Sequence, residues 1–328
     1  MSSYLKAPFR HSTYPRKILY KLLKLLDRFA PYRRVYRGII IKKSGKSPPL
    51  PSEIAIETTN LCNARCAICA HPVMKRPQGY MDSALVKSLI DQAAAARVRK
   101  LFLSGFGEPL LDKRLPEFIA LAKNKGISAV AIVTNGHLLR EPLAKELIKS
   151  GIDEVTISIG GFTDDIYEKV RSGLKLTPII ENVKRFHDLR FKGRPRVNIA
   201  SVDLITNHGQ RHLAKSLLGA YVDSIFFRQA QGWTENIAEE MAAWSPHYEI
   251  NDIPCRYLWN SINIHIDGKV PACCLDYEGL GNMGDATCQP IEDIWNGRRF
   301  TDYRNAHLHA SKSGLEPCKN CGYYSVWW

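Results

Sequence analysis

The sequence contains no run as long and apolar as a membrane-spanning helix requires. Its first residues, MSSYLKAPFRHSTYPRK, also lack the apolar core of a secretory signal. With 45% hydrophobic and 24% charged residues, the 328-residue chain has a composition that excludes disorder and fibres and favours an ordinary globular protein. We therefore expect a cytoplasmic location, where the nine cysteines stay reduced and clustered thiols hold metal more often than disulfides.

Acidic residues are almost missing from residues 1–50, which hold 13 Lys and Arg against the single Asp27. This arm carries most of the formal net charge of +14, so the rest of the chain is nearly neutral. A neutral body without a basic stripe of stacking aromatics argues against a nucleic-acid partner. Within the arm, residues 14–34 predict a basic amphipathic helix. Its apolar side either packs on the body or makes peripheral contact with the inner face of the membrane.

After the linker SGKSPPLPS, short apolar or β-branched segments alternate with helical ones. The expected strands are 53–59, 100–105, 129–136, 154–161, 196–205 and 222–227, and the expected helices are 83–98, 114–126, 142–151, 164–173, 178–190 and 209–219. Such succession predicts an α/β fold with a parallel sheet and right-handed crossovers. Periodicity alone leaves open a doubly wound sheet or a partly closed barrel. In both, functional residues are expected on loops after the carboxyl ends of the strands.

Three cysteines lie together directly after the first expected strand, in NLCNARCAICAHP. Cys62, Cys66 and Cys69 could ligate three corners of a four-iron cluster and leave the fourth iron without a protein ligand, as a catalytic cluster needs. A structural zinc site requires four ligands, and His71 could be the fourth. A disulfide with a spare thiol fits a reducing compartment poorly.

The spacing Cys62-X3-Cys66-X2-Cys69 resembles the signature of the radical S-adenosylmethionine (SAM) superfamily. The resemblance continues after the next three strands. Gly105-Phe106-Gly107-Glu108-Pro109 is similar to the GGEP loop, Thr134-Asn135-Gly136 ends the third strand, and Ser158-Ile159-Gly160-Gly161 is similar to the S-I-D-G segment.

The resemblance implies a partial (β/α)6 TIM-like barrel over residues 51–230, with a [4Fe-4S] cluster on the three cysteines and SAM on the open iron. The implied SAM contacts are Gly105, Phe106, Gly107, Glu108, Asn135, Ser158 and Arg171. Arg171 could instead be an ordinary solvent-exposed arginine at the end of a helix, with no contact to SAM. The chain departs from the pattern where Phe106 interrupts the glycine pair and Gly160 replaces the usual Asp.

The other six cysteines lie in the last quarter of the chain. SINIHIDGKVPACC predicts a β-hairpin turning at Asp267-Gly268, and residues 290–307 predict one helix. Four thiols, at Cys255, Cys273, Cys318 and Cys321, could hold a closed cluster or zinc. Cys274 and Cys288 are left over, and we expect both to be buried as small apolar residues.

This part of the chain resembles the auxiliary-cluster extension called SPASM in its long form and twitch in its short form. The resemblance implies a small C-terminal domain over residues 231–328 with Cys255, Cys273, Cys318 and Cys321 around one auxiliary [4Fe-4S] cluster. Only one is implied, because no cysteine follows Cys321.

The resemblance implies an enzyme that cleaves SAM reductively to a 5′-deoxyadenosyl radical, which removes hydrogen from the substrate, with electrons from a donor such as flavodoxin or ferredoxin. We expect a radical SAM oxidoreductase that dehydrogenates, or modifies by related radical chemistry, a small sugar-like or aminocyclitol-like molecule. Two alternatives stay open: a peptide-modifying maturase, and a non-catalytic zinc or iron-sulfur protein that binds nucleic acid. The sequence identifies no general base.

Overall fold

The computed structural model of the protein describes residues 38–39, 41–42, 48–229 and 254–321. The amphipathic helix expected over 14–34 lies outside the described residues, as does part of the C-terminal domain expected from residue 231. Within the described residues, no helix combines the length and apolar character needed to cross a membrane.

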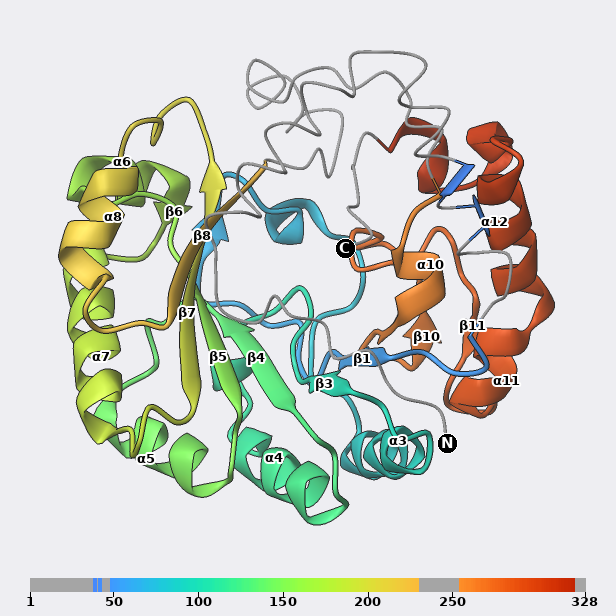
Figure 1. Ribbon diagram of the computed structural model, residues 1–328, viewed down its shortest axis with the longest axis horizontal. Coiled ribbons are helices and arrows are strands. Elements are labelled where there is room, and N and C mark those ends of the chain that lie inside the picture. The colour runs from blue at the N-terminus through green and yellow to red at the C-terminus, as the bar shows by residue number, and fades with distance from the viewer. Residues whose placement is uncertain (1–37, 40, 43–47, 230–253, 322–328) are drawn as a thin grey trace.

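Seven parallel strands form the central sheet, in the spatial order β8-β7-β5-β4-β3-β1-β9. Their bounds are β1 Glu53–Ile56, β3 Lys100–Phe102, β4 Val130–Thr134, β5 Glu154–Ser158, β7 Arg196–Asp203, β8 Ser224–Gln229 and β9 Ser261–Ile264. Figure 1 shows that the sheet curves as an incomplete barrel, with the crossover helices on its outside. The expected α/β class and partial barrel are confirmed.

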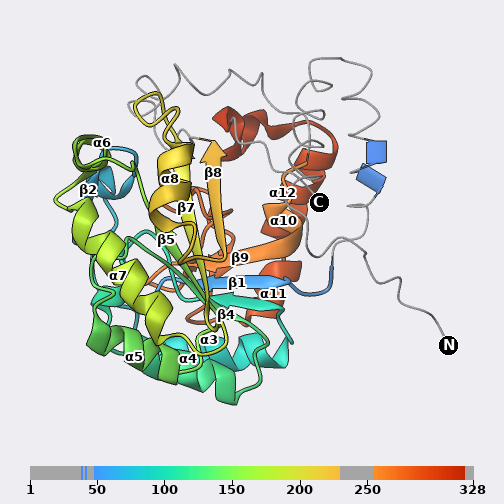
Figure 2. The same cartoon turned by 60° about the vertical axis from the view of Figure 1, so that its left-hand side comes forward.

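The crossover helices cover the outer face of the sheet (Figures 1 and 2). They are α3 Ser83–Ala95, α4 Leu115–Asn124, α5 Glu141–Lys149, α6 Asp164–Val170, α7 Leu176–Leu189 and α8 Arg211–Leu218. Strand residues Ile54, Ile132 and Ile157 are fully buried. Val133 on β4 points to the opposite face from Ile132, because strand side chains alternate, and is 39% exposed. The apolar core therefore lies between sheet and helices.

The C-terminal extension contributes a strand to the sheet, which corrects the expected hairpin. The turn is present, with Gly268 at φ +81° and the His265 N–H donating to the Lys269 carbonyl at 2.9 Å. However, β9 pairs in parallel with β1, and β10 Lys269–Val270 pairs instead with β11 Gly284–Asp285. Because β9 pairs with β1 in the main sheet, the C-terminal extension lies directly beside the first strand of the barrel.

The helix expected over residues 290–307 is two helices, α11 Ile291–Asn296 and α12 Arg298–Leu308. Gly297 separates them with an extended backbone, ψ 167°, which ends the first helix and precedes the second. The short α10, Tyr257–Asn260, leads into β9. Sequence periodicity missed the break because helical apolar spacing continues across it.

Helix α11 ties the linker before β1 to the extension. The Trp295 indole Nε1 donates to the Pro48 carbonyl at 2.9 Å, and the Asn296 amide donates to the Pro49 carbonyl at 3.0 Å. Trp295 is fully buried, with its ring 5.0 Å from that of Phe300. Pro48 and Pro49 are thus held against the C-terminal helix α11.

Replacing Trp295 with phenylalanine is expected to destabilise the protein by about 1–3 kcal/mol, because the Pro48 carbonyl loses its donor and the smaller ring leaves a gap. Asn296→Ala, which removes only the exposed bonds to the Pro49 and Glu292 carbonyls, is expected to cost less than about 0.5 kcal/mol. Thermal unfolding of the anaerobically purified variants measures both. Equal melting temperatures for Trp295→Phe and wild type would contradict the linker's attachment.

Candidate functional site

The cysteine loop follows β1 and is held at its middle by a two-stranded pairing. β2, Arg65–Cys66, pairs antiparallel with β6, Arg171–Ser172, which follows α6. The Ala67 N–H adds a bond to the Val170 carbonyl at 3.0 Å. The middle cysteine is therefore fixed against the loop after the fourth barrel strand, about a hundred residues away in sequence.

The three thiols of this loop lie close enough to influence one another electrostatically. Cys66 is buried, whereas Cys62 and Cys69 are half-buried. Burial raises the pKa of the Cys62 thiol to about 11, and the negative charge of Glu108 acts in the same direction. Burial also raises the pKa of Cys69, whose sulfur accepts the His71 N–H at 3.4 Å. Thiolates at these positions need a compensating positive charge, which a metal centre would supply.

His71, in the short 3-10 helix η1 (His71–Val73), uses one ring nitrogen within the protein. Its Nε2 lies 2.7 Å from the Asn60 carbonyl oxygen. Across residues 48–229 and 254–321, no three His, Cys, Asp or Glu side chains are placed to hold a single metal ion. A cluster makes no such demand, because each cysteine binds a different iron. The contact with Asn60 occupies one of the two ring nitrogens through which His71 could bind a metal.

Glu108 of the GFGEP segment joins the ends of two barrel strands. Its fully buried carboxylate accepts from the Thr134 hydroxyl at 2.6 Å, the Asn135 N–H at 2.7 Å and the Leu110 N–H at 3.0 Å. Burial raises the pKa of this carboxyl, which the hydrogen bonds partly oppose. Glu108 lies just before the short 3-10 helix η2, Pro109–Leu111, and caps it.

The GFGEP segment also touches the cysteine loop directly. A Cβ on Gly107 would come within 2.5 Å of the Thr59 carbonyl oxygen and 2.6 Å of that of Leu61. The Glu108 N–H donates to the same Leu61 carbonyl at 2.8 Å. A residue with a side chain at position 107 would push the two loops apart, so glycine is required there by close approach.

Asn135 and Ser158 occupy the ends of the next two strands. The Asn135 amide donates to the Asn63 side chain at 2.8 Å, which links the β4 end to the cysteine loop. Ser158 is the last residue of β5 and is half-buried. A Cβ on Gly160 would lie 2.6 Å from a Val170 methyl group, so the position of the usual Asp has no room for one here.

Arg171 is half-buried and faces the cysteine loop. Its Nη1 donates to the Cys66 sulfur at 3.4 Å. Its Nε and the nearby Tyr167 hydroxyl are buried and have no hydrogen-bond partner within the described part of the chain. Buried donors of this kind usually have a partner. Arg171 is therefore a polar group available to an anionic ligand next to the cysteines.

The second group of thiols gathers in the C-terminal extension. Burial raises the pKa of Cys273 well above its usual value, and the charges of Cys274, Cys255, Cys318 and Cys321 act in the same direction. Cys318 begins the short 3-10 helix η4, Cys318–Asn320, which follows η3, Lys312–Gly314. The Cys321 N–H donates to the Cys318 carbonyl at 3.2 Å, as the Cys69 N–H does to the Cys66 carbonyl. Cys255, Cys318 and Cys321 therefore lie near enough to Cys273 for their charges to act on it, as does the neighbouring Cys274.

The two leftover cysteines differ from expectation and from each other. Cys274 is half-buried beside Tyr257 and near Cys321. Cys288 is exposed, so the expectation that it is buried was wrong. It follows the short β11 in a polar turn, where its sulfur donates to the Asp285 carbonyl. The sequence pattern could not predict the exposure of Cys288, because a single cysteine in a turn has no periodic apolar neighbours.

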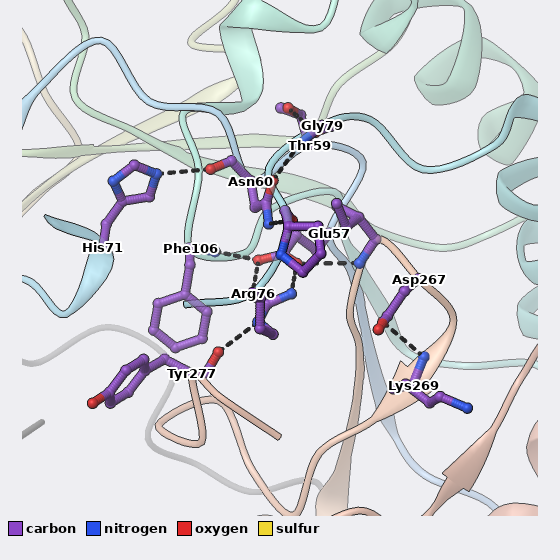
Figure 3. A network of polar contacts seen from close by, with 12 residues as sticks. Glu57, Thr59, Asn60, His71, Arg76, Gly79, Phe106, Asp267, Lys269 and Tyr277 are labelled. Atoms are coloured by element: carbon purple, nitrogen blue, oxygen red, sulfur yellow. Dashed lines mark hydrogen bonds and ion pairs between the residues drawn. The ribbon is translucent and has the colours of Figure 1, made fainter. Parts of the chain in front are cut away.

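Glu57 is a central site residue that the sequence analysis missed. It follows β1 and is only 2% exposed, yet it lies among loops from three parts of the chain (Figure 3). The signal available was a carboxylate directly after the apolar residues of the first strand, five residues before the first cysteine. Sequence alone could not identify its partners.

Comparison with known proteins agrees with this arrangement of two thiol groups. Residues 56–213 match the radical SAM superfamily, and residues 255–322 match the SPASM iron-sulfur cluster-binding domain. The chain is a radical SAM protein with a C-terminal SPASM domain. These domains imply a SAM-binding [4Fe-4S] cluster, an auxiliary cluster and SAM as cofactors.

Among curated relatives, the chain is 26% identical to the S-adenosyl-L-methionine-dependent 2-deoxy-scyllo-inosamine dehydrogenase of Niallia circulans, over 84% of this chain and 94% of the relative. It is 29% identical to the probable GTP 3′,8-cyclase of Methanococcus maripaludis, over 46% of the chain and half of the relative. It is 34% identical to the PqqA peptide cyclase of Xanthomonas oryzae, over 34% of the chain and 30% of the relative.

Solved structures share the fold of this radical SAM protein. BtrN in complex with AdoMet and 2-DOIA has a TM-score of 0.57 at 24% identity, covering 84% of this chain and 95% of BtrN. Streptococcus suis SuiB bound to the precursor peptide SuiA has a TM-score of 0.65 at 14% identity, covering 93% of this chain and 75% of SuiB.

Proposed function

We propose that this radical SAM protein is an oxidoreductase that dehydrogenates a small sugar-like or aminocyclitol-like molecule. The observation that carries the proposal is the correspondence, over 84% of this chain and 94% of the relative, with a 2-deoxy-scyllo-inosamine dehydrogenase. The similarity to a peptide cyclase covers only about a third of this chain.

The cysteine loop fits a cluster with one open iron. We propose Cys62, Cys66 and Cys69 as its ligands, because the three thiols share one loop and Cys66 lies close enough for its charge to act on the pKa values of Cys62 and Cys69. The buried and unpartnered Arg171 Nε is proposed to meet the carboxylate of SAM. When bound, cluster and SAM supply a carbon-centred radical that removes a hydrogen atom from an unactivated carbon.

The barrel residues orient the cofactor. We propose that the backbone of Gly105, Phe106 and Gly107 receives the amino group of SAM, with Glu108 fixing that loop through its bonds to the β4 end. Asn135 holds the β4 end to the cysteine loop, and Ser158 is proposed as a further contact from β5. The inner face of β4 is open at Val133, beside the carboxyl ends of the strands where substrate is expected.

The second thiol group fits a closed cluster. We propose Cys255, Cys273, Cys318 and Cys321 as ligands, since four protein thiolates leave no open iron for substrate. Such a centre suits electron transfer, and a small electron carrier such as flavodoxin or ferredoxin is the proposed donor to the enzyme. The SPASM domain is proposed to support a two-electron oxidation of the substrate, by taking up the electron left after hydrogen removal.

The proposed reaction is tested with anaerobically reconstituted enzyme, SAM, a reductant and 2-deoxy-scyllo-inosamine or related aminocyclitols and sugars. The expected result is 5′-deoxyadenosine formed together with the corresponding ketone in equal amounts, measured by mass spectrometry. Deoxyadenosine without an oxidised product from any of these molecules would contradict the proposal. A cross-linked product from a peptide substrate would replace it with peptide modification.

A further inference from the structure

The carboxylate of Glu57 collects four N–H donors from three separate segments (Figure 3). Arg76 donates Nη1 to Oε2 at 2.9 Å and Nη2 to Oε1 at 3.1 Å. The Phe106 N–H donates to Oε1 at 2.8 Å, and the Ile266 N–H donates to Oε2 at 3.2 Å. Both oxygens therefore have two donors each, which leaves the buried charge well satisfied.

Arg76 extends the connection into the SPASM domain. Its Nε donates to the Tyr277 carbonyl at 2.5 Å, and its side chain is only 9% exposed. The neighbouring Lys75 N–H donates to the Glu278 carboxylate at 2.8 Å. Tyr277 follows Asp276, whose N–H donates to the Cys273 carbonyl at 3.2 Å, so the Arg76 bond reaches the segment that carries Cys273.

Glu57 also determines the shape of the GFGEP loop. A Cβ on Gly105 would lie 2.4 Å from the Glu57 Cγ and 2.6 Å from its Oε1, so only glycine permits this approach. Because a trans peptide points its N–H and C=O in opposite directions, the bond from the Phe106 N–H turns the Gly105 carbonyl away from Glu57. The carboxylate thus fixes the orientation of a peptide group proposed to contact SAM.

The Phe106 side chain reinforces the same junction. Its ring lies edge-on to those of His265 and Tyr277, with centroids 6.3 and 6.1 Å away, and the Arg76 guanidinium is 5.9 Å from its centroid. His265 comes directly after β9, and burial lowers its pKa to about 3. The phenylalanine that interrupts the usual glycine pair therefore packs between barrel and SPASM domain.

We propose that Glu57 is a positioning residue that couples the SAM-binding loop to the SPASM domain. One buried carboxylate orients the Gly105-Phe106 peptide and holds the turn after β9, while its partner Arg76 reaches the segment after Cys273. The inference rests on the proposed SAM contact of the GFGEP loop. Glu57 is thus a residue whose loss changes both the SAM-binding loop and the SPASM domain, although it is a ligand of neither proposed cluster.

The deciding variant is Glu57→Gln, studied in the anaerobically reconstituted full chain. Its amide places an N–H₂ group against N–H donors and leaves the buried Arg76 charge unpaired. We expect SAM to bind about tenfold more weakly, the change that follows from losing one charge-assisted hydrogen bond. Hydrogen exchange over residues 262–285 is expected to rise about tenfold as well, with the iron content unchanged.

The matched control is Asp112→Asn. Asp112 is equally buried and also pairs with an arginine, accepting from the Arg114 Nε at 2.8 Å and its Nη2 at 2.9 Å. Its bonds to Arg114 stay within the barrel. We expect SAM affinity and exchange over 262–285 to remain within about twofold of wild type. Equal effects of Asp112→Asn and Glu57→Gln would reduce Glu57 to a general structural role and overturn the proposal.

Arg76→Lys separates the two connections and serves if Glu57→Gln does not fold. Lysine keeps the charge but cannot reach both Glu57 oxygens and the Tyr277 carbonyl. Exchange over 262–285 is expected to rise several-fold, whereas SAM affinity stays near wild type because the Phe106 bond persists. Unchanged hydrogen exchange over 262–285 in Arg76→Lys would overturn the proposed coupling. So would unchanged SAM binding in a folded Glu57→Gln protein. Neither readout requires the substrate, so a failed dehydrogenation assay leaves this test intact.

Discussion

Replacing Cys66 with alanine is expected to abolish SAM cleavage and to lower the iron content of the reconstituted protein from about eight to about four. Cys66 is buried, sits in the β2–β6 pairing and accepts from Arg171. Its neighbours Cys62 and Cys69 cannot hold a cluster alone, and no other cysteine lies in this loop. Iron analysis and an assay for deoxyadenosine with SAM and reductant measure the effect.

The control for Cys66→Ala is Cys288→Ala, because Cys288 is exposed and belongs to neither thiol group. We expect it to keep full iron content and wild-type cleavage. Tightly bound zinc in wild type with no SAM cleavage, or cleavage that survives in Cys66→Ala, would contradict the assignment of the loop as the SAM-binding cluster site.

Replacing Cys318 with alanine is expected to remove about four irons while leaving SAM cleavage measurable, with loss of the oxidised product. Burial raises the pKa of Cys318, and the charges of Cys255 and Cys321 act in the same direction. The first thiol group lies in a separate loop, so its cluster should form without the second. The ratio of ketone to deoxyadenosine is the informative measurement, because it separates substrate oxidation from cofactor cleavage.

Cys288→Ala again provides the reference for Cys318→Ala, with an expected ratio near that of wild type. Retention of about eight irons in Cys318→Ala would remove Cys318 from the proposed ligand set. A wild-type product ratio together with the loss of four irons would instead show that the auxiliary centre does not take part in the oxidation.

Local features account for the parts of the fold and site that could be predicted. The six strand-helix units follow from short apolar runs separated by glycine-rich turns, and the Asp267-Gly268 turn follows from the left-handed backbone that glycine allows. The errors lie where a local pattern is compatible with several partners. β9 has the apolar alternation of a hairpin strand, but the free edge of β1 offers it a longer parallel neighbour.

The sequence by itself determined which cysteines are close neighbours, because three thiols on one short loop and the C-X2-C pair of Cys318 and Cys321 need only local spacing. Only the tertiary structure decided which distant groups meet at the thiols and at the buried carboxylate of Glu57. Arg171 reaches Cys66 across 105 positions, and Ile266 reaches Glu57 across 209. No periodicity encodes such pairs, because they arise when the ends of parallel strands and their loops converge at one edge of the sheet.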